Sequence, residues 1–290
     1  MQNRKQIDKD ISLIGAFKGL AQAYEEISVT KMQRAKGKVL SSRTFLEDIS
    51  AVFADVKGSY KREIDNLIEH HRKGLFTFNT NNKNGKTIAV LLSSNNKLYG
   101  DIGKKVFRFF MESARKTNPD IYVIGRVGRE LYENTQDKKE YRYIDFPEDE
   151  KAKKNIGELL KILEEYQTVN VYYGQFVNVI TQNPVIANVS GTQNLEGKRV
   201  NPKKQVHFFF EPSLESVLTI FENQIFESLF RQTLHESELS HVTSRIQQME
   251  YALENIEVSQ KRLNKKRRLV IKRQESAKRL QRLSGISLWR

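Results

Sequence analysis

Proline is missing from both ends of this 290-residue chain, and its distribution constrains the fold more than any other feature. All five prolines lie from Pro119 to Pro212. Because proline interrupts the interior of a helix, the residues on either side of this region can form long helices. From Ile7 onward, positions separated by alternating steps of four and three residues are mostly apolar. This spacing runs for about seven heptads and predicts an N-terminal coiled-coil helix.

The predicted inward positions of this helix are Ile7, Ile11, Ile14, Lys18, Ala21, Glu25, Ser28, Met32, Ala35, Val39, Ser42, Leu46, Ile49, Phe53, Val56 and Tyr60. Lys18 and Glu25 are the charged residues among these positions, and the others are apolar or carry a hydroxyl group.

The C-terminal segment has the same spacing after Ser213, a residue type that caps helix N-termini. One position of each heptad stays apolar, at Met249, Ile256, Leu263, Val270 and Ala277. The other changes from Ile246 and Leu253 to Gln260, Arg267, Gln274 and Gln281. The narrowing stripe is typical of a two-stranded coil or of a helix that finally runs alone. A helix from Ser213 to Gly285 would be on the order of 100 Å long, so we expect an elongated chain with its terminal helices wound together.

The middle of the chain has the pattern of an α/β sheet domain. Apolar runs at 87–93, 121–125 and 141–146 predict strands, and helical spacing at 98–116 and 151–166 predicts helices between them. Further strands are expected within 169–189 and at 205–210. The predicted fold is therefore α/β plus coiled coil, with helical segments at 1–72 and 212–290 and an α/β domain at 73–211.

The net charge of +14 indicates acidic partners, such as phosphate backbones, anionic lipid or carboxylate-rich protein. The absence of cysteine excludes disulfides, thiolate nucleophiles and cysteine-ligated metals. No window reaches the roughly 18 apolar residues of a membrane span, so no direct span is expected. The N-terminus also lacks the apolar core of a signal peptide.

Two glycine-containing motifs resemble phosphate-binding loops only in part. Gly85-Lys86-Thr87 resembles the end of a P-loop, but position 80 is Thr80 and the tripeptide precedes a strand instead of following one. Residues 125–129 follow a strand, as dinucleotide loops do, but lack the spacing of three glycines. We interpret both as structural turns, with a nucleotide-using α/β enzyme as an alternative for the second.

Other catalytic or metal-binding signals are weak. His235 and His241 are six residues apart, whereas two ligands on one helical face need a spacing of three or four. We therefore predict no catalytic residue, no metal and no cofactor. The basic run at 264–282 contains nine Lys or Arg and one acid, Glu275. It fits a solvated helix face, and a nucleic-acid-binding helix is the alternative.

Several motifs along the chain resemble the gamma subunit of F-type ATP synthases. The most specific block is FENQIFESLFRQ at 221–232, followed by His235-Glu236-Ser237, by SRIQQM at 244–249 and by Glu254-Asn255. The agreeing pieces elsewhere are KMQRA at 31–35, Ser93-Ser94 with LYGD at 98–101, IGRVGR at 124–129 and Phe210-Glu211-Pro212.

This resemblance implies a central rotor shaft, with an antiparallel coiled coil of the two terminal helices and a Rossmann-like α/β foot. It implies alpha and beta subunits of a catalytic hexamer, an epsilon-like subunit and a c-subunit ring as partners, with no specific nucleic acid. It also implies a peripheral location at the cytoplasmic face of the cell membrane. The subunit itself would be non-catalytic and would couple rotation of the ion-driven ring to the catalytic sites.

The resemblance also assigns roles to residues. Arg267 and Arg268 correspond to the pair that engages a catch loop of the beta subunit, with Lys31 and Arg34 as lesser contacts. Leu280, Leu283, Ile286, Leu288 and Trp289 correspond to the shaft tip and its bearing. Lys198, Arg199, Lys203 and Lys204 correspond to the loop of the foot that faces the ring.

Three features depart from the family pattern. Residues 24–27 read YEEI where the family has an apolar and lysine-rich stretch, and Tyr99 replaces a usual cysteine. The tip carries Lys278, Arg279, Arg282 and Arg290 where the family is small and apolar. These departures raise the alternative of a paralogous rotary ATPase that only hydrolyses ATP.

Overall fold

The computed structural model describes residues 4–59, 83–136, 139–146, 153–190, 211 and 213–287. The elements in chain order are α1 (Arg4–Ser59), β1 (Thr87–Leu92), α3 (Ile102–Thr117), β2 (Asp120–Ile124), α4 (Arg126–Glu133), β3 (Tyr141–Ile144), α5 (Lys153–Glu164), β4 (Thr168–Phe176), β5 (Gln182–Asn188) and α6 (Leu214–Ser287). The chain divides into two compact units, Met1–Thr30 with Arg245–Arg290, and Lys31–Ser244. Both α1 and α6 contribute to both units.

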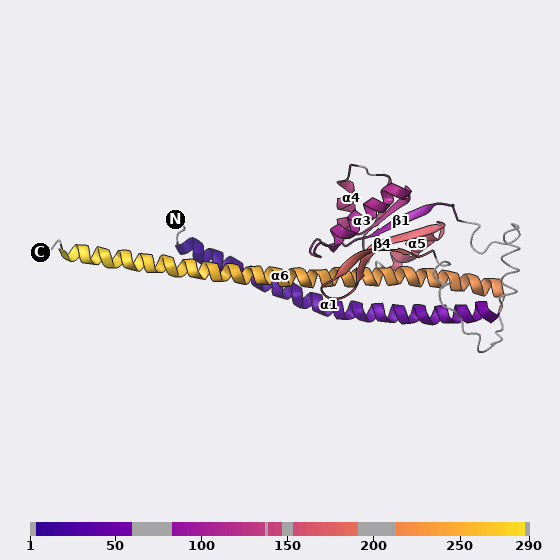
Figure 1. Cartoon of the computed structure of the whole chain (residues 1–290), viewed down its shortest axis with the longest axis horizontal. Coiled ribbons are helices and arrows are strands. Elements are labelled where there is room, and N and C mark those ends of the chain that lie inside the picture. The colour runs from indigo at the N-terminus through magenta and orange to yellow at the C-terminus, as the bar shows by residue number, and fades with distance from the viewer. Residues whose placement is uncertain are drawn as a thin grey trace. The chain divides into compact units, whose positions relative to one another are not determined.

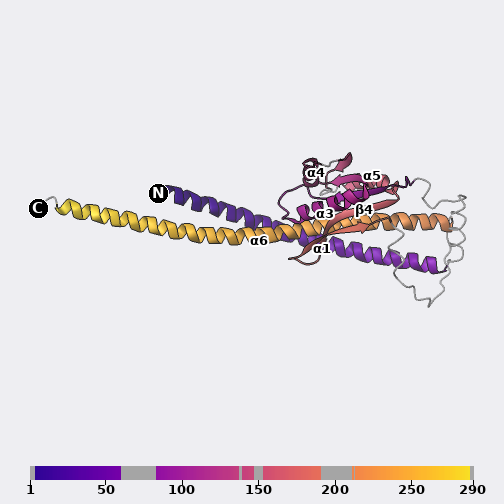
Figure 2. The same cartoon turned by 45° about the horizontal axis from the view of Figure 1, so that its top comes forward.

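The two long terminal helices are present, with 56 residues in α1 and 74 in α6. The first turn of α6 is capped as expected, because Ser216 N–H donates to Ser213 Oγ at 3.2 Å. Within Lys31–Ser244, α1 runs antiparallel beside α6, as both views show (Figure 1, Figure 2). Ion pairs in the other unit join the two helices in the same antiparallel sense, because Lys18 meets Glu257 and Asp8 meets Arg267.

Most positions of the four-and-three spacing lie on the covered side of each helix, as far as Val270 on α6. On α1, Ile7 and Val39 are buried and Ile11 and Ile14 are half-buried. Lys18 is also half-buried, and its ammonium group pairs with the Glu257 carboxylate at 3.3 Å. On α6 the half-buried positions are Met249, Leu253, Ile256, Leu263 and Val270. Beyond Ile271, every described side chain as far as residue 283 is exposed, which matches the narrowing of the apolar stripe.

The sheet has five strands in the order β3-β2-β1-β4-β5. The strands β1 to β4 pair in parallel, and β5 pairs antiparallel with β4. Parallel neighbours need crossover helices, which α3, α4 and α5 supply. The predicted strands at 87–93, 121–125 and 141–146 are therefore observed, and the region 169–189 contains two strands.

Alternate residues of β1 serve the two faces of the sheet, as a period of two requires. Ile88, Val90 and Leu92 join a core with α5 and with Phe226 and Phe230 of α6. Ala89 and Leu91 join a second core with α3 and with Tyr132 of α4. Figure 1 shows the corresponding layers, with α3 and α4 on one side of the sheet and α6 on the other. The sheet domain is thus fixed to α6 by a continuous apolar core.

The structure adds one element that the sequence did not predict. The eight-residue helix α4 follows β2 directly, where we expected only a turn. The strand predicted at 205–210 and the segment boundary predicted at residue 72 lie outside the described residues. The division into three segments stays a prediction.

Candidate functional site

The part of α6 that crosses the sheet carries a band of buried polar residues. Its members within Lys31–Ser244 are Ser228, Thr233, Glu236, Ser237, Ser240, His241, Thr243 and Ser244. Small side chains let the helix and β4 approach closely, and Gly174 of β4 shows how closely. A Cβ atom at Gly174 would lie 2.6 Å from Ser240 Oγ, well inside van der Waals contact. The polar band therefore seats α6 against the sheet.

Glu236 is the centre of a hydrogen-bond network that joins three elements. Its side chain is 3% exposed, and Arg43 of α1 donates from Nη2 to Glu236 Oε1 at 2.7 Å. The Tyr173 hydroxyl of β4 donates to Oε2 at 3.2 Å, and Gln232 Nε2 donates to Oε1 at 3.2 Å. A buried carboxylate needs such partners because burial removes its hydration. The network therefore sets the register of α1, α6 and β4 together.

The same network perturbs Tyr173. Burial raises the pKa of the Tyr173 phenol well above its usual range, and the neighbouring Glu236 carboxylate raises it further. The phenol therefore stays neutral and acts as a hydrogen-bond donor to Glu236.

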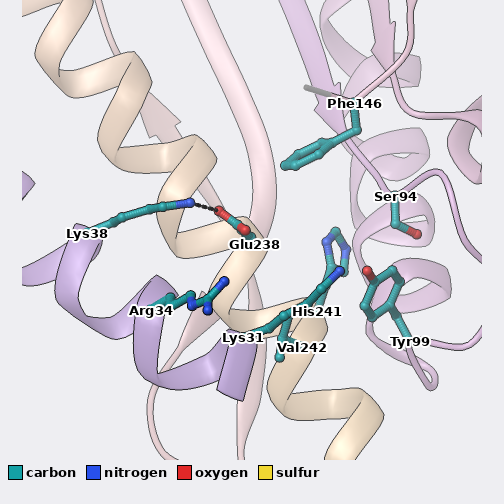
Figure 3. Close-up of a pocket in the computed structure, with 9 residues that line it drawn as sticks. All are labelled: Lys31, Arg34, Lys38, Ser94, Tyr99, Phe146, Glu238, His241 and Val242. Atoms are coloured by element: carbon teal, nitrogen blue, oxygen red, sulfur yellow. Dashed lines mark hydrogen bonds and ion pairs between the residues drawn. The ribbon is translucent and has the colours of Figure 1, made fainter. Parts of the chain in front are cut away.

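A pocket of about 200 Å³ is lined by residues of α1, α6 and the loops that follow β1 and β3 (Figure 3). Three cations of α1, Lys31, Arg34 and Lys38, lie along one side, and Glu238 of α6 pairs with Lys38 at 3.3 Å. The remaining lining residues are Ser94, Tyr99, Phe146, His241 and Val242. The His241 ring lies against the Tyr99 and Phe146 rings, with centroids 5.5 and 6.5 Å apart. The pocket thus combines a cationic rim with a buried aromatic wall.

The four residues that the resemblance assigns to a catch contact fall into different units. Lys31 and Arg34 lie at the pocket, while Arg267 and Arg268 belong to the unit of the chain termini. Arg267 is paired within the chain, because its Nε lies 2.7 Å from Asp8 Oδ1. Arg268 is exposed and has no carboxylate partner within the described part of the chain. The catch assignment of the four residues stays a prediction, with two of them in each unit.

The other assigned residues lie at the edges of the described chain. Leu280 and Leu283 are on α6 and are 68% and 65% exposed, so both are available to a partner. Ile286 is within α6, and Leu288 and Trp289 lie outside the described residues, as do Lys198, Arg199, Lys203 and Lys204.

The glycines at 125–129 serve packing. Gly125 has φ 102°, and a Cβ there would lie 2.7 Å from the Ser93 carbonyl carbon. The N–H groups that would cradle a phosphate at this turn are already used. Gly125 N–H donates to Ile144 O at 2.9 Å and Val127 N–H donates to Ser94 O at 2.9 Å. Arg126 N–H points to Asn95 Oδ1 at 3.4 Å. Gly125 and the start of α4 therefore serve packing, although a helix stands here where we expected only a turn.

Among the described residues, no group of three His, Cys, Asp or Glu side chains is placed to hold a metal ion. Within the same residues, no helix is both long and apolar enough to cross a membrane.

Sequence reasoning missed Arg43, Glu236 and Tyr173 as a group. In the sequence, Glu236 stands out only as part of a family motif. Its place between the small residues Thr233 and Ser240 on a predicted helix is the one local sign that its carboxylate is buried. No local pattern marks Arg43, which is 193 residues from its partner.

Comparisons of sequence and of structure both find that this chain is similar to chains of ATP synthases. A sequence model of a family described as "ATP synthase" matches residues 3–276. An "ATP synthase gamma chain" of Ruthia magnifica subsp. Calyptogena magnifica is 25% identical over 262 residues, which cover 87% of each chain.

Solved structures show the same similarity in fold. A chain of the Euglena gracilis mitochondrial ATP synthase has a TM-score of 0.58 at 12% identity, over 98% of this chain and 95% of that one. A chain of the central stalk and c-ring of the Tetrahymena thermophila mitochondrial ATP synthase has a TM-score of 0.52 at 19% identity, over 80% and 99%.

Proposed function

This chain belongs to the ATP synthase family, in which its similarity is to the gamma subunit, and from this premise we propose that it is the central-stalk shaft of a rotary ATP synthase. It transmits rotation of an ion-driven membrane ring to catalytic subunits and performs no chemistry itself. The observation that carries the proposal is the extent of the family match. Residues 3–276 include all of α1, most of α6 and the whole described sheet domain.

The similarity favours this function over two of the three alternatives that the sequence left open. The relatives are ATP synthase chains, which supports the synthase shaft over a shaft that only hydrolyses ATP. A nucleic-acid-binding role gains no support from them. The occupied N–H groups after β2 argue separately against nucleotide binding at that turn.

A shaft acts by offering each catalytic site a different face as it turns. A partner shifts a conformational equilibrium only through a difference in contact free energy between two states. The described residues supply the needed stiffness, because the Glu236 network ties α1 to α6 and β4. Ion pairs Lys18–Glu257 and Asp8–Arg267 join the helices again in the other unit.

The proposed partners are alpha and beta subunits of a catalytic hexamer, an epsilon-like subunit and a c-subunit ring. The Tetrahymena chain of similar fold comes from a central stalk with its c-ring, which supports this assignment. We propose a peripheral position on the cytoplasmic face of the cell membrane. The loop with Lys198, Arg199, Lys203 and Lys204 would face the ring, and the end of α6 with Leu280 and Leu283 would turn in the hexamer.

Among the proposed catch residues, Arg268 is the strongest candidate. It is exposed and lacks a carboxylate partner in the described chain, so an acidic loop of the beta subunit can bind it directly. Arg267 must first leave Asp8, and Lys31 and Arg34 are lesser candidates. Arg273→Ala is a matched control for Arg268→Ala, since both remove one exposed cation from α6.

Co-expression with the cognate alpha and beta chains tests the main proposal. We expect a complex with one copy of this chain per hexamer, measured by native mass spectrometry. A purified hexamer that never captures the chain would refute the shaft function.

The catch assignment is tested in the same complex. We expect Arg268→Ala, alone or with Arg267→Ala, to lower ATPase activity per complex more than it lowers assembly. Arg267→Ala alone should act mainly on the helix pair, through an exposed ion pair worth up to about 1 kcal/mol. Impaired assembly with normal activity per assembled complex would contradict the assignment.

A further inference from the structure

Three cations follow one another along the face of α1 at the pocket of Figure 3. Lys31, Arg34 and Lys38 are spaced by three and four residues, so they are neighbours on one helical face. Like charges at this spacing repel one another and weaken a helix. Only Lys38 is neutralised within the described chain, by Glu238 at 3.3 Å. The pocket rim therefore retains a net charge of about two.

The opposite wall of the pocket is ordered before any ligand arrives. Tyr99, Phe146 and His241 are each less than a tenth exposed, and their rings pack against one another. Ser94 is 6% exposed, and its hydroxyl donates to Asn96 O at 2.8 Å. Because the side chains of this wall are already packed, little ordering of the protein is required on that side when a ligand binds.

We propose that this pocket binds a phosphate group, either as the free anion or as part of a small phosphate ester. Arg34 supplies a planar guanidinium that suits the bidentate recognition of phosphate, and Lys31 supplies a second charge one turn away. The cavity of about 200 Å³ holds more than one phosphate group, and its apolar lining, Phe146 and Val242, suits a small organic part. Glu238 stays paired with Lys38 at one end, so its carboxylate does not oppose the anion.

A bound phosphate would have a mechanical effect within Lys31–Ser244. The cations belong to α1, whereas Ser94, Tyr99 and Phe146 belong to loops of the sheet domain. An anion held by Lys31 and Arg34 against that wall would join the helix to the sheet domain at a second point besides the Glu236 network. It would stabilise their packing in proportion to the ligand concentration.

The test uses the full chain and inorganic phosphate, with phosphoglycolate as a small ester. We measure saturable binding by ³¹P NMR line broadening and by the shift of the thermal midpoint, with sodium chloride matching the ionic strength. We expect saturation with phosphate or the ester in the wild type. Lys31→Gln with Arg34→Gln should weaken the affinity by about tenfold or more, as expected on losing a charge-assisted contact.

The matched control changes the same number of charges elsewhere on α1. Lys9→Gln with Lys36→Gln removes two exposed cations that do not line the pocket, and should bind phosphate as the wild type does. Equal weakening in both double variants, or a response that never saturates, would mean an adventitious ion only and would overturn the proposal. Tighter binding of acetate or glutamate than of phosphate would also overturn it, because a carboxylate would then be the preferred ligand.

This test is independent of the shaft function. Failure of phosphate binding leaves capture by the hexamer unchanged, and failure of capture leaves the binding curve of the isolated chain unchanged.

Discussion

Removing Arg43 should destabilise the fold because it leaves the Glu236 carboxylate buried without its cation. Hydrogen bonds to charged groups contribute about 1.5–3 kcal/mol, and breaking a fully buried ion pair costs about 3–5 kcal/mol. The Arg43 side chain is 43% exposed, so its charge is partly screened by water. Tyr173 and Gln232 also remain as donors to Glu236. We therefore expect Arg43→Ala to lower the free energy of unfolding by about 2 kcal/mol.

A double-mutant cycle measures the pair directly. Urea unfolding of the full chain, followed by circular dichroism, compares Arg43→Ala, Glu236→Gln and the double variant. We expect a coupling free energy of roughly 1–2 kcal/mol, because the amide no longer needs a cation. Lys38→Ala is the control on the same helix, since its pair with Glu238 is exposed on both sides and is worth up to about 1 kcal/mol. An Arg43→Ala cost no larger than that of Lys38→Ala would refute the reasoning.

Two further predictions concern backbone space and alkaline pH. Gly125→Ala should cost more than about 3 kcal/mol, because φ is 102° and the new Cβ would meet Ser93 backbone, whereas Gly157→Ala in α5 meets nothing within 4 Å and should stabilise by up to about 1 kcal/mol. Urea midpoints of the two variants check this, and equal midpoints would contradict it. Folding raises the pKa of the Tyr173 phenol, so the neutral phenol contributes to the free energy of unfolding. This contribution is fully present below about pH 10 and is lost as the pH rises above that value. Tyr173→Phe should therefore lose less stability than the wild type between pH 9 and 10.5, and parallel losses would show that other groups dominate.

The candidate sites were predictable to different degrees. The family resemblance assigned roles to Arg268, Leu280 and Leu283, and these roles stay predictions. The structure shows that the three side chains are exposed. The ion pair between Arg267 and Asp8 could not be predicted from the sequence. The chain contains 49 Lys or Arg and 35 Asp or Glu, and the sequence does not say which cation pairs with which carboxylate. The pocket was missed for the same reason, because its lining comes from α1, α6 and two loops.

The sequence by itself determined the elements whose causes are local. Missing prolines and a period of three to four residues produced α1 and α6, and continuous apolar runs produced β1 and β2. The helix α4 escaped prediction because its eight residues include Gly128, which weakens the helical pattern but is required by packing against Ser93. Only the tertiary structure decided that Glu236 is a buried centre that binds Arg43 and Tyr173. The physical reason is that burial and ion pairing depend on which surfaces meet, and these surfaces come from segments far apart in the chain.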